Sequence, residues 1–530
     1  MLDFDVIQIG FGPVGQTNAA LLGQRGHRVA VFERWPQVYP LPRAGHFDHE
    51  VLRIFQGIGV AEQIERHAIP IPDYDWVNGD GTLLLHMDWN QPTPSGWKSD
   101  YLMYQPYMED ALMRAVGVQP SVKVHLGWEA TEISERADHV AVTLREGRLV
   151  DGVWTATGST RTVTAKYLVG ADGAGSLVRR ATGIAMTDYG FEEDWLVLDV
   201  RPHDPDLTID MPEAGQICDP ARPVSLFRWL GREHCRWEFM LLPGESPEDM
   251  STQDKAWELL ARWGLDATNA DVIRRAVYTF RSLIADDFRK GRALLIGDAA
   301  HQMPPFMGQG MCTGVRDAAN LAWKLDLVLR GHSPDALLDT YTVERRPHAD
   351  ELIKTSIALG QVVCISDPEA AAARDTAFLT GQVPPPPPFP WITKGVLGPD
   401  GTGEAVGRLG VQGRLVHDGR TGLADDVTGT GWALLSRRSG LTEILSDEQR
   451  DFLARIGARV LHVTRADIDR PDTALDLDAT YARWFDRLQA DVVLVRPDYY
   501  VFGTAPDVAS APHLVDALRA AVSVKATASP

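Results

Sequence analysis

Three glycines near the N-terminus, Gly10, Gly12 and Gly15, have the spacing that points most directly to chemistry. They follow an apolar β-branched run and precede a helical pattern, as in a strand–turn–helix unit. In Gly-x-Gly-x-x-Gly, the first glycine makes a tight turn, the second lets the backbone approach a pyrophosphate, and the third lets helix and strand pack closely. Glu33 ends the next apolar run, about twenty residues further on, where a carboxylate binds an adenosine ribose. The pattern predicts a site for ADP-ribose; a glycine-rich turn that binds nothing is the alternative.

Two later motifs each place an aspartate directly after an apolar strand pattern. Asp172 and Gly173 follow one such run, and Gly297 and Asp298 follow another. Ligands of parallel sheets bind at the carboxyl ends of the strands. Asp298 is therefore positioned to accept hydrogen bonds from a polyol such as a ribityl chain. The alternative for each aspartate is a structural one, capping a helix or shaping a turn.

A proline- and glycine-rich loop follows the second motif and opens a long helical pattern over residues 313–329. Its candidate site residues are Pro305, Gly308, Gly310 and Met311. A helix N-terminus attracts negative charge, and a reduced flavin is anionic at its pyrimidine end. The loop therefore predicts a flavin contact, with an ordinary flexible loop as the alternative.

The elements that must position these residues indicate an α/β protein with several parts. Buried parallel strands are predicted at 6–9, 29–32, 167–170 and 293–296, and one helix at 48–64. Alternating segments between 188 and 281 favour antiparallel strands. We expect a Rossmann-like nucleotide-binding domain (1–187 and 282–383, with 70–105 contributing to the substrate lobe), an inserted mixed or antiparallel-sheet substrate domain (188–281), a proline-rich linker (384–402) and a small C-terminal α/β domain (403–530).

Composition excludes several classes of protein. The chain has 530 residues, 44% of them hydrophobic, and a formal net charge of −20. Such an acidic surface repels phosphate backbones and anionic lipids, so neither nucleic acid nor membrane is expected as a partner. The four cysteines form no CxxC pair and show no zinc-site spacing, and the N-terminal residues are acidic where a signal peptide is basic. These features predict a cytoplasmic protein that acts on small molecules and binds no metal.

The three glycine-containing motifs, in this order, resemble those of the class A flavoprotein monooxygenases, the FAD-dependent aromatic hydroxylases related to para-hydroxybenzoate and phenol hydroxylase. The resemblance covers about residues 1–380. Residues 39–44, 301–306 and 310–317 are most similar to the subgroup of 3-(3-hydroxyphenyl)propionate hydroxylases. The C-terminal part resembles the thioredoxin-like domain of phenol hydroxylase relatives, but it contains no cysteine and so cannot carry out dithiol exchange. The resemblance implies a para-hydroxybenzoate hydroxylase-like fold with that domain appended, in a structural role or as a contact in a homodimer.

The resemblance also implies which residues hold FAD. Those implied for the adenosine diphosphate end are Gly10, Gly12, Gly15, Glu33 and Arg34. Those implied for the pyrophosphate, ribityl chain, nicotinamide contact and flavin ring are Arg43, Gln105, Asp172, Gly173, Gly297, Asp298, Pro305, Gly308, Gly310 and Met311. The co-substrates would be O2 and NADH or NADPH, between which the sequence does not choose.

In this family NAD(P)H reduces the flavin, dioxygen forms a C4a-hydroperoxide, and an electron-rich ring attacks it. A base near the phenol would help, and His46, Asp48 and His49 are candidates by residue type, although solvent-facing or helix-capping roles are open to them. The expected substrate is a small phenol, of the 3-(3-hydroxyphenyl)propanoate kind. The alternatives are a polyketide or other natural-product phenol, an FAD-dependent reductase or dehydrogenase that does not activate oxygen, and a non-catalytic flavin-binding module.

Overall fold

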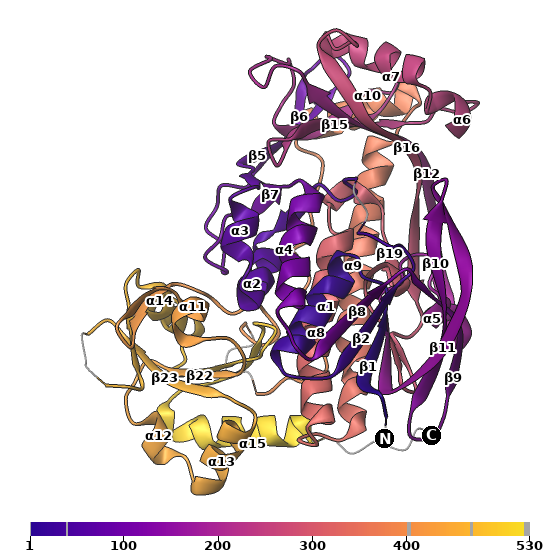
Figure 1. Cartoon of the computed structure of the whole chain (residues 1–530). Coiled ribbons are helices and arrows are strands. Elements are labelled where there is room, and N and C mark those ends of the chain that lie inside the picture. Colours follow the sequence, from indigo (N-terminus) through magenta and orange to yellow (C-terminus); the bar gives the residue numbers. More distant parts are fainter. Residues whose placement is uncertain (1, 39–40, 400–403, 467–469, 524–530) are drawn as a thin grey trace.

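A computed structural model describes residues 2–38, 41–399, 404–466 and 470–523, which form three regions (Figure 1). Residues 39–40 of the motif at 39–44, and residues 400–403 at the expected end of the linker, lie outside the described residues. None of the described helices is long and apolar enough to cross a membrane.

The first region is built on an eight-stranded sheet with a parallel core in the order β18–β11–β1–β2–β8. Its strands are β1 (Phe4–Ile9), β2 (Val29–Glu33), β8 (Val122–Leu126), β9 (Trp128–Glu135), β10 (Val140–Val150), β11 (Val153–Gly170), β17 (Arg289–Lys290) and β18 (Ala293–Leu295). The strands β1, β2, β11 and β18 correspond to the four apolar runs predicted from the sequence. The antiparallel extension through β9 and β10 was not predicted, although β10 begins with an alternation of buried and partly exposed residues that is typical of a strand.

Helices cover this sheet and join it to the rest of the chain. They are α1 (Pro13–Gln24), α2 (His49–Ile58), α3 (Ala61–Glu65), α4 (Gln105–Gly117), α5 (Leu177–Thr182), η2 (Gly297–Ala299), η3 (Pro305–Met307), α8 (Gly310–Leu329), η4 (Asp335–Leu338) and α9 (Asp339–Val363). α1 packs against both α4 and α8. The prediction of one helix over 48–64 is wrong: Gly59 adopts a left-handed conformation (φ +89°) and ends α2 before α3 begins.

The second region is an eight-stranded sheet that stands above the first in Figure 1, in the order β19–β16–β12–β15–β14–β13–β5–β6. Its strands are β5 (Asp73–Asn78), β6 (Leu83–Asp88), β12 (Met186–Pro202), β13 (Ala214–Cys218), β14 (Val224–Leu230), β15 (His234–Met240), β16 (Ala270–Ala285) and β19 (His301–Gln302). The helices α6 (Pro247–Met250), α7 (Gln253–Leu260), η1 (Ala261–Trp263) and α10 (Pro368–Leu379) accompany it. All its strand pairs are antiparallel except β5 with β13, so the sheet is mixed. The small sheet β3 (His46–Asp48), β7 (Asp100–Leu102) and β4 (Ile69–Pro70) connects the two regions.

The third region is a seven-stranded sheet in the order β21–β20–β24–β23–β22–β25–β26. Its elements are β20 (Arg414–His417), β21 (Arg420–Leu423), α11 (Ala424–Thr428), β22 (Ala433–Ser436), α12 (Leu441–Ile444), α13 (Asp447–Arg455), β23 (Arg459–Thr464), β24 (Thr473–Asp476), α14 (Thr480–Leu488), β25 (Val492–Val495), β26 (Val501–Ala505), η5 (Val508–Ser510) and α15 (Ala511–Val522). β22 is parallel to β23 and antiparallel to β25, which is antiparallel to β26. This is the thioredoxin-like core, so the predicted α/β fold class with its inserted sheet is confirmed.

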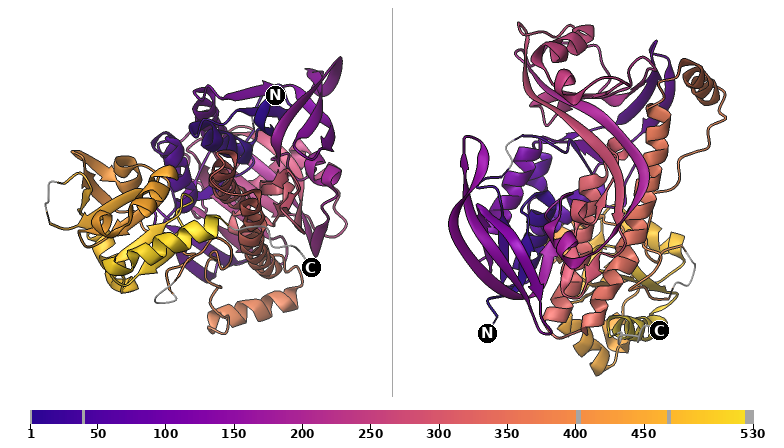
Figure 2. Two further views of the ribbon diagram at one scale, coloured as in Figure 1. Left: turned by 90° about the horizontal axis from the view of Figure 1, so that it is seen from below. Right: turned by 90° about the vertical axis from the view of Figure 1, so that its right-hand side faces the viewer.

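Buried ion pairs join the C-terminal domain to the first region. The Arg53 Nε lies 2.7 Å from Asp425, with both side chains almost fully buried. Arg496, completely buried, bonds Glu344 of α9 at 2.6 Å and Asp498 at 2.6 Å. Because separating such pairs would leave buried charges without partners, the C-terminal domain is held as a fixed part of the molecule. Figure 2 shows it against the ends of the central helices, on the opposite side from the β9–β11 strands.

Candidate functional site

The glycine turn between β1 and α1 has the geometry that close approach of a phosphate requires. Gly10 has φ +100°, and a Cβ there would lie 2.1 Å from the carbonyl oxygen of Ala171. A Cβ on Gly15 would lie 2.7 Å from the carbonyl oxygen of Gly10, whereas a Cβ on Gly12 would meet no atom within 4 Å. α1 begins here with no side-chain cap and no acidic residue in its first turn. Its backbone N–H groups are therefore available to an anion.

Glu33, at the end of β2, lies beside this turn. Its carboxylate accepts hydrogen bonds from the backbone N–H of Phe11 at 3.0 Å and of Trp35 at 2.9 Å. These bonds fix one acidic group next to the phosphate-binding turn, as recognition of a ribose requires. Arg34 is exposed, with its guanidinium 4.9 Å from the ring centroid of Trp35.

The two aspartate motifs have different surroundings. Asp172 accepts hydrogen bonds from the Ser176 hydroxyl at 2.5 Å and from the backbone N–H of Val178 at 3.1 Å, so its carboxylate caps α5. This is the structural alternative considered above, and Gly173 (φ +73°) makes the turn before that helix. Asp298, in contrast, is exposed to solvent, although the protein around it desolvates it enough to raise its pKa. Its carboxylate is therefore accessible to the hydroxyl groups of a ligand.

Other predicted cofactor residues lie on segments that pack around these motifs. A Cβ on Gly297 would lie 3.3 Å from the Val14 side chain, so η2 packs closely on α1. The Gln105 amide oxygen accepts hydrogen bonds from the backbone N–H of Arg43 at 3.0 Å and of Ala44 at 2.7 Å. The Arg43 side chain is exposed, and its charge partly offsets the desolvation that raises the pKa of Asp298.

The loop before α8 provides a second uncapped helix N-terminus. Pro305 begins η3, and Gly308 follows it with φ +64°. α8 starts at Gly310 with neither a side-chain cap nor an acidic residue in its first turn. A Cβ on Gly310 would meet only the Met303 side chain, at 3.8 Å. Together with Met311, the loop therefore offers free backbone N–H groups to a negatively charged ring edge.

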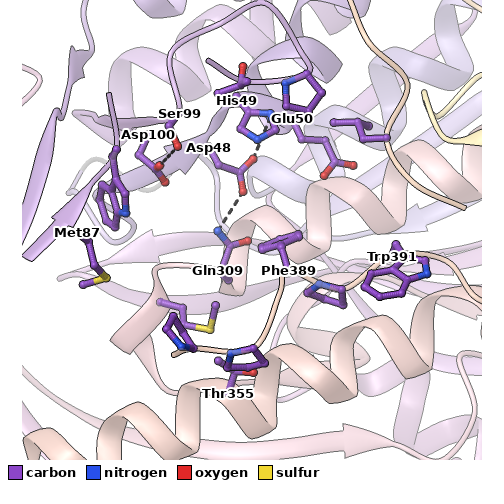
Figure 3. Close-up of a pocket in the computed structure, with 18 of the residues that line it drawn as sticks. Asp48, His49, Glu50, Met87, Ser99, Asp100, Gln309, Thr355, Phe389 and Trp391 are labelled. Atoms are coloured by element: carbon purple, nitrogen blue, oxygen red, sulfur yellow. Dashed lines mark hydrogen bonds between the residues drawn. The ribbon is translucent and has the colours of Figure 1, made fainter. Parts of the chain in front are cut away.

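A cavity of about 2230 Å³ adjoins this loop and extends from the inserted sheet to the C-terminal domain. Figure 3 shows part of its wall. Its walls on the sheet side are mainly apolar and aromatic, including Ile71, Tyr74, Trp76, Leu84, Met87, Trp89, Phe227 and Phe306. The proline-rich segment adds further wall residues, among them Phe389 and Trp391. The volume exceeds that of a common small-molecule pocket, about 300–1,000 Å³, so the cavity has room for an aromatic ligand beside the loop.

His46 is the predicted catalytic residue whose bonding is most informative. Its Nδ1 lies 3.2 Å from the carbonyl oxygen of Gly308, which only accepts, so Nδ1 carries a proton. Its Nε2 lies 2.8 Å from the Asp100 carboxylate. Burial lowers the pKa of His46, but the hydrogen bond and charge of Asp100, helped by Cys312, outweigh burial and raise the pKa well above its usual range. With a hydrogen-bond acceptor facing each ring nitrogen, His46 is held as an imidazolium on the cavity wall.

Asp48 and His49 have other bonding partners. One Asp48 oxygen caps α2, accepting from the backbone N–H of Glu50 and of Val51 at 3.1 Å each. Its other oxygen bonds Arg316 at 2.5 Å and Gln309 at 3.0 Å. Burial raises the pKa of Asp48, but the Arg316 charge and the hydrogen bonds from Arg316 and from the backbone N–H of Val51 act together with other nearby charge to outweigh burial, and they hold this pKa far below its usual range. Asp48 is thus a fully bonded anchor, which leaves it little capacity to accept a substrate proton.

His49 Nδ1 lies 3.0 Å from the Ser95 hydroxyl, and His49 lines the same cavity. Several site residues were not predicted from the sequence, namely Ser99, Asp100, Gln309, Arg316, Phe389 and Tyr500, all of which line the cavity. Of these, Gln309 stood within the glycine loop and Arg316 within the segment 310–317, but neither was assigned a role. Phe227 of the inserted sheet lines the cavity, whereas Trp195 and Trp237 of the same sheet are fully buried core residues.

Comparisons with known proteins agree with this geometry. The FAD binding domain family model matches residues 3–356, and the HcaD C-terminal domain model matches residues 407–521. The chain is 37% identical over 524 residues to a probable NADH-specific resorcinol 4-hydroxylase of Rhodococcus jostii (strain RHA1), covering 98% of this chain and 95% of the relative. It is 33% identical over 571 residues to a 3-(3-hydroxy-phenyl)propionate/3-hydroxycinnamic acid hydroxylase of Comamonas testosteroni, covering 95% and 94%.

Among solved structures, the flavin-dependent monooxygenase PieE in complex with FAD and substrate superimposes with a TM-score of 0.79 at 22% identity, covering 98% of this chain and 100% of PieE. This similarity shows the shared fold. The family model covers well over half of the chain and the two relatives align over nearly all of it. The chain therefore belongs to the FAD-binding family of aromatic hydroxylases, with FAD as its cofactor.

Proposed function

We propose that the chain hydroxylates a small phenol with NADH and dioxygen, and that the pair His46–Asp100 handles the phenolic proton. The observation that carries the proposal is the position of this pair. It stands on the wall of an apolar cavity and is bonded directly to Gly308, in the loop that precedes α8. The reaction consumes a phenol, O2, NADH and a proton, and it yields a ring with one additional hydroxyl group, NAD⁺ and water.

The residues around the two uncapped helices fit FAD. Gly10, Gly12, Gly15 and Glu33 would hold its adenosine diphosphate end, Asp298 its ribityl hydroxyls, and Gly310–Met311 its ring. When bound, FAD supplies electron transfer from NADH to dioxygen and delivery of one oxygen atom to the ring. The protein's contribution is orientation, proton handling and exclusion of water.

The proton chemistry follows from the charges of the pair. An ionised Asp100 accepts hydrogen bonds, so a phenolic O–H at this wall would donate to it. The imidazolium of His46 would then stabilise the negative charge that grows on the phenol oxygen as its proton leaves. A phenolate is a stronger nucleophile than a phenol, so this arrangement favours oxygen transfer to the ring. The Ser99 hydroxyl, bonded to the other oxygen of Asp100, extends the path by which the proton could leave (Figure 3).

We propose a single-ring phenol of the hydroxyphenylpropanoate or resorcinol type as the substrate. The names of the two relatives support this choice, as do the aromatic walls of the cavity, which suit a planar ring. NADH is the proposed reductant because one relative is named as specific for it.

The test is a panel of phenols, with NADH and NADPH compared and product masses measured under ¹⁸O2. We expect substrate-stimulated NADH oxidation and a product that gains one labelled oxygen atom. Turnover of fused-ring natural-product phenols alone would contradict the proposed substrate class. NADH oxidation without labelled product for every substrate would contradict monooxygenation and indicate a reductase.

A further inference from the structure

A buried network joins the C-terminal domain to the loop that precedes α8. It consists of Tyr500, Glu50, Arg316, Asp48 and Gln309, and we call it the interdomain network. The Tyr500 hydroxyl donates to one Glu50 oxygen at 2.7 Å, and the Arg316 Nε donates to the other at 2.6 Å. Arg316 continues to Asp48 at 2.5 Å and to the Gln309 amide oxygen at 2.9 Å, while the Gln309 amide nitrogen donates to Asp48 at 3.0 Å.

All five side chains are at most 5% exposed, and all five line the cavity described above. Asp48 points toward Gln309 in Figure 3, with Phe389 of the proline-rich segment nearby. The Arg316 guanidinium lies 5.0 Å from the centroid of the Phe389 ring, which adds a cation–π contact. The network therefore gathers groups from the nucleotide-binding region, the proline-rich segment and the C-terminal domain at one wall of the site.

The two buried carboxylates of the interdomain network are stabilised by every hydrogen-bond donor that it contains. Two carboxylates, Asp48 and Glu50, share one guanidinium, so the cluster carries excess negative charge in a buried place. The Tyr500 hydroxyl supplies the additional donor to Glu50. Without it, a buried carboxylate oxygen loses its partner, and Glu50 then competes more strongly with Asp48 and Gln309 for Arg316. A change at Tyr500 is thereby transmitted to Gln309.

Gln309 is the end of the network that matters for chemistry. Its backbone carbonyl accepts from the Thr313 side chain and backbone N–H, both at 2.8 Å, in the first turn of α8. Its side chain, held on both amide atoms, fixes the residue between Gly308 and Gly310. We infer that Tyr500 is a positioning residue, through which the C-terminal domain sets the loop that orients the flavin ring. This inference rests on the proposed role of that loop in FAD binding.

The test compares Tyr500→Phe with Tyr499→Phe in the full-length, FAD-loaded protein. Tyr499 is a matched control, since it is also a buried tyrosine of this domain whose hydroxyl reaches the first region, donating to the carbonyl oxygen of Arg53 at 3.2 Å. It takes no part in the interdomain network. The readouts are FAD content, the visible spectrum of the bound flavin, and the hydrogen peroxide released per NADH oxidised in the presence of substrate.

We expect Tyr500→Phe to retain FAD, to shift the flavin spectrum and to raise peroxide release about two- to tenfold, the equivalent of one lost buried hydrogen bond. Tyr499→Phe should match the wild type in all three readouts. In a double-mutant cycle with Gln309→Ala, the two effects should be non-additive, because both changes act on the same loop. If Tyr500→Phe loses FAD, Glu50→Gln interrupts the same path and should give the same spectral shift and peroxide release.

Equal behaviour of the two tyrosine variants, strict additivity with Gln309→Ala, or wild-type coupling in Glu50→Gln would overturn the inference. These results are distinct from failure of the proposed function. In that case the wild-type protein itself would show no substrate-stimulated NADH oxidation, whatever the behaviour of the variants.

Discussion

The Asp100→Asn substitution removes the negative charge beside His46 while preserving the shape of the pair. The side-chain amide that it introduces can donate to the Nε2 that Asp100 now faces at 2.8 Å. The Nδ1 proton stays on the carbonyl oxygen of Gly308. A neutral imidazole therefore satisfies both bonds in the variant, whereas the wild-type pair requires an imidazolium. The substitution changes the charge of His46 and the acceptor for the phenol while leaving the hydrogen-bond geometry in place.

The expected loss is about 100-fold in the rate of hydroxylation. Positioned acid–base groups contribute roughly 10²–10⁴-fold, and the lower end applies because the His46 ring and the Ser99 hydroxyl stay in place. Below the raised pKa of His46 the wild type has its imidazolium, and hydroxylation should decline as the pH rises through that pKa. In Asp100→Asn the burial of His46 lowers its pKa without an opposing carboxylate. The activity of the variant should therefore recover as the pH is lowered.

The assay is stopped-flow measurement of product formation across the pH range, with NADH oxidation followed in parallel. The matched control is Asp75→Asn, because Asp75 pairs with His86 at the same distance of 2.8 Å and raises the pKa of His86. In contrast to the buried pair of the site, the His86 and Asp75 side chains are 49% and 32% exposed, and neither residue is among those that line the cavity. The control should leave both rate and pH profile unchanged. A wild-type rate and profile in Asp100→Asn would refute the assigned proton chemistry.

Three further predictions concern the cofactor and stability. Gly12→Val should fold, because a Cβ at this position meets no protein atom within 4 Å, but it should lose FAD in a titration, because the added side chain stands where the backbone approaches the pyrophosphate. Gly10→Ala should lower the melting temperature, because its Cβ would lie 2.1 Å from a main-chain oxygen. Burial raises the pKa of Glu344, but its cationic partners outweigh burial and lower this pKa from 4.5 to about 2. The ionised carboxylate therefore stabilises the fold by about 3 kcal/mol above pH 4.5, and this stabilisation is lost as the pH falls toward 2. Glu344→Gln should make the free energy of unfolding depend less on pH in acid denaturation. Arg53→Met should destabilise the protein by about 3–5 kcal/mol in thermal unfolding, because it leaves the buried Asp425 carboxylate without its cation. Adding Asp425→Leu should restore most of the lost stability. Equal stability of the single and double variants would contradict the view that the unpaired buried charge causes the loss.

The nucleotide-binding framework could be predicted because its signals are local. The turn at Gly10 requires a residue without a Cβ, and the buried strands around it are continuous apolar runs. The same local logic gave the helix predicted over 313–329, although α8 begins three residues earlier, at Gly310. It failed at Gly59, where one glycine in a left-handed conformation divides a stretch of helical pattern. The strands β9 and β10 were also missed, although the alternating burial at the start of β10 is a local strand signal.

The proposed catalytic residues on the cavity wall could be predicted only in part. His46 was chosen by residue type, but its protonation depends on Asp100, which lies 54 positions away and meets it through the pairing of β3 with β7. Asp48 was chosen by the same criterion, yet its partner Arg316 comes from α8. Pairings over such distances arise from tertiary packing, so no spacing in a single sequence reveals them. Tyr500 is a still more remote case, because it belongs to another domain.

The position of Arg496 has a consequence for protein engineering. This side chain, fully enclosed, satisfies Glu344 of the long helix α9 and the main-chain oxygen of Val396 just before the C-terminal domain. Chimeras in which a relative's tail is spliced on after the proline-rich segment must therefore import a guanidinium at this place, or leave the buried Glu344 with Lys324 as its remaining ion-pair partner among the described residues. Successful recombinants between homologous hydroxylases should keep both halves of that contact from one parent, so the natural crossover point lies inside α9 before Glu344 rather than in the prolines that follow.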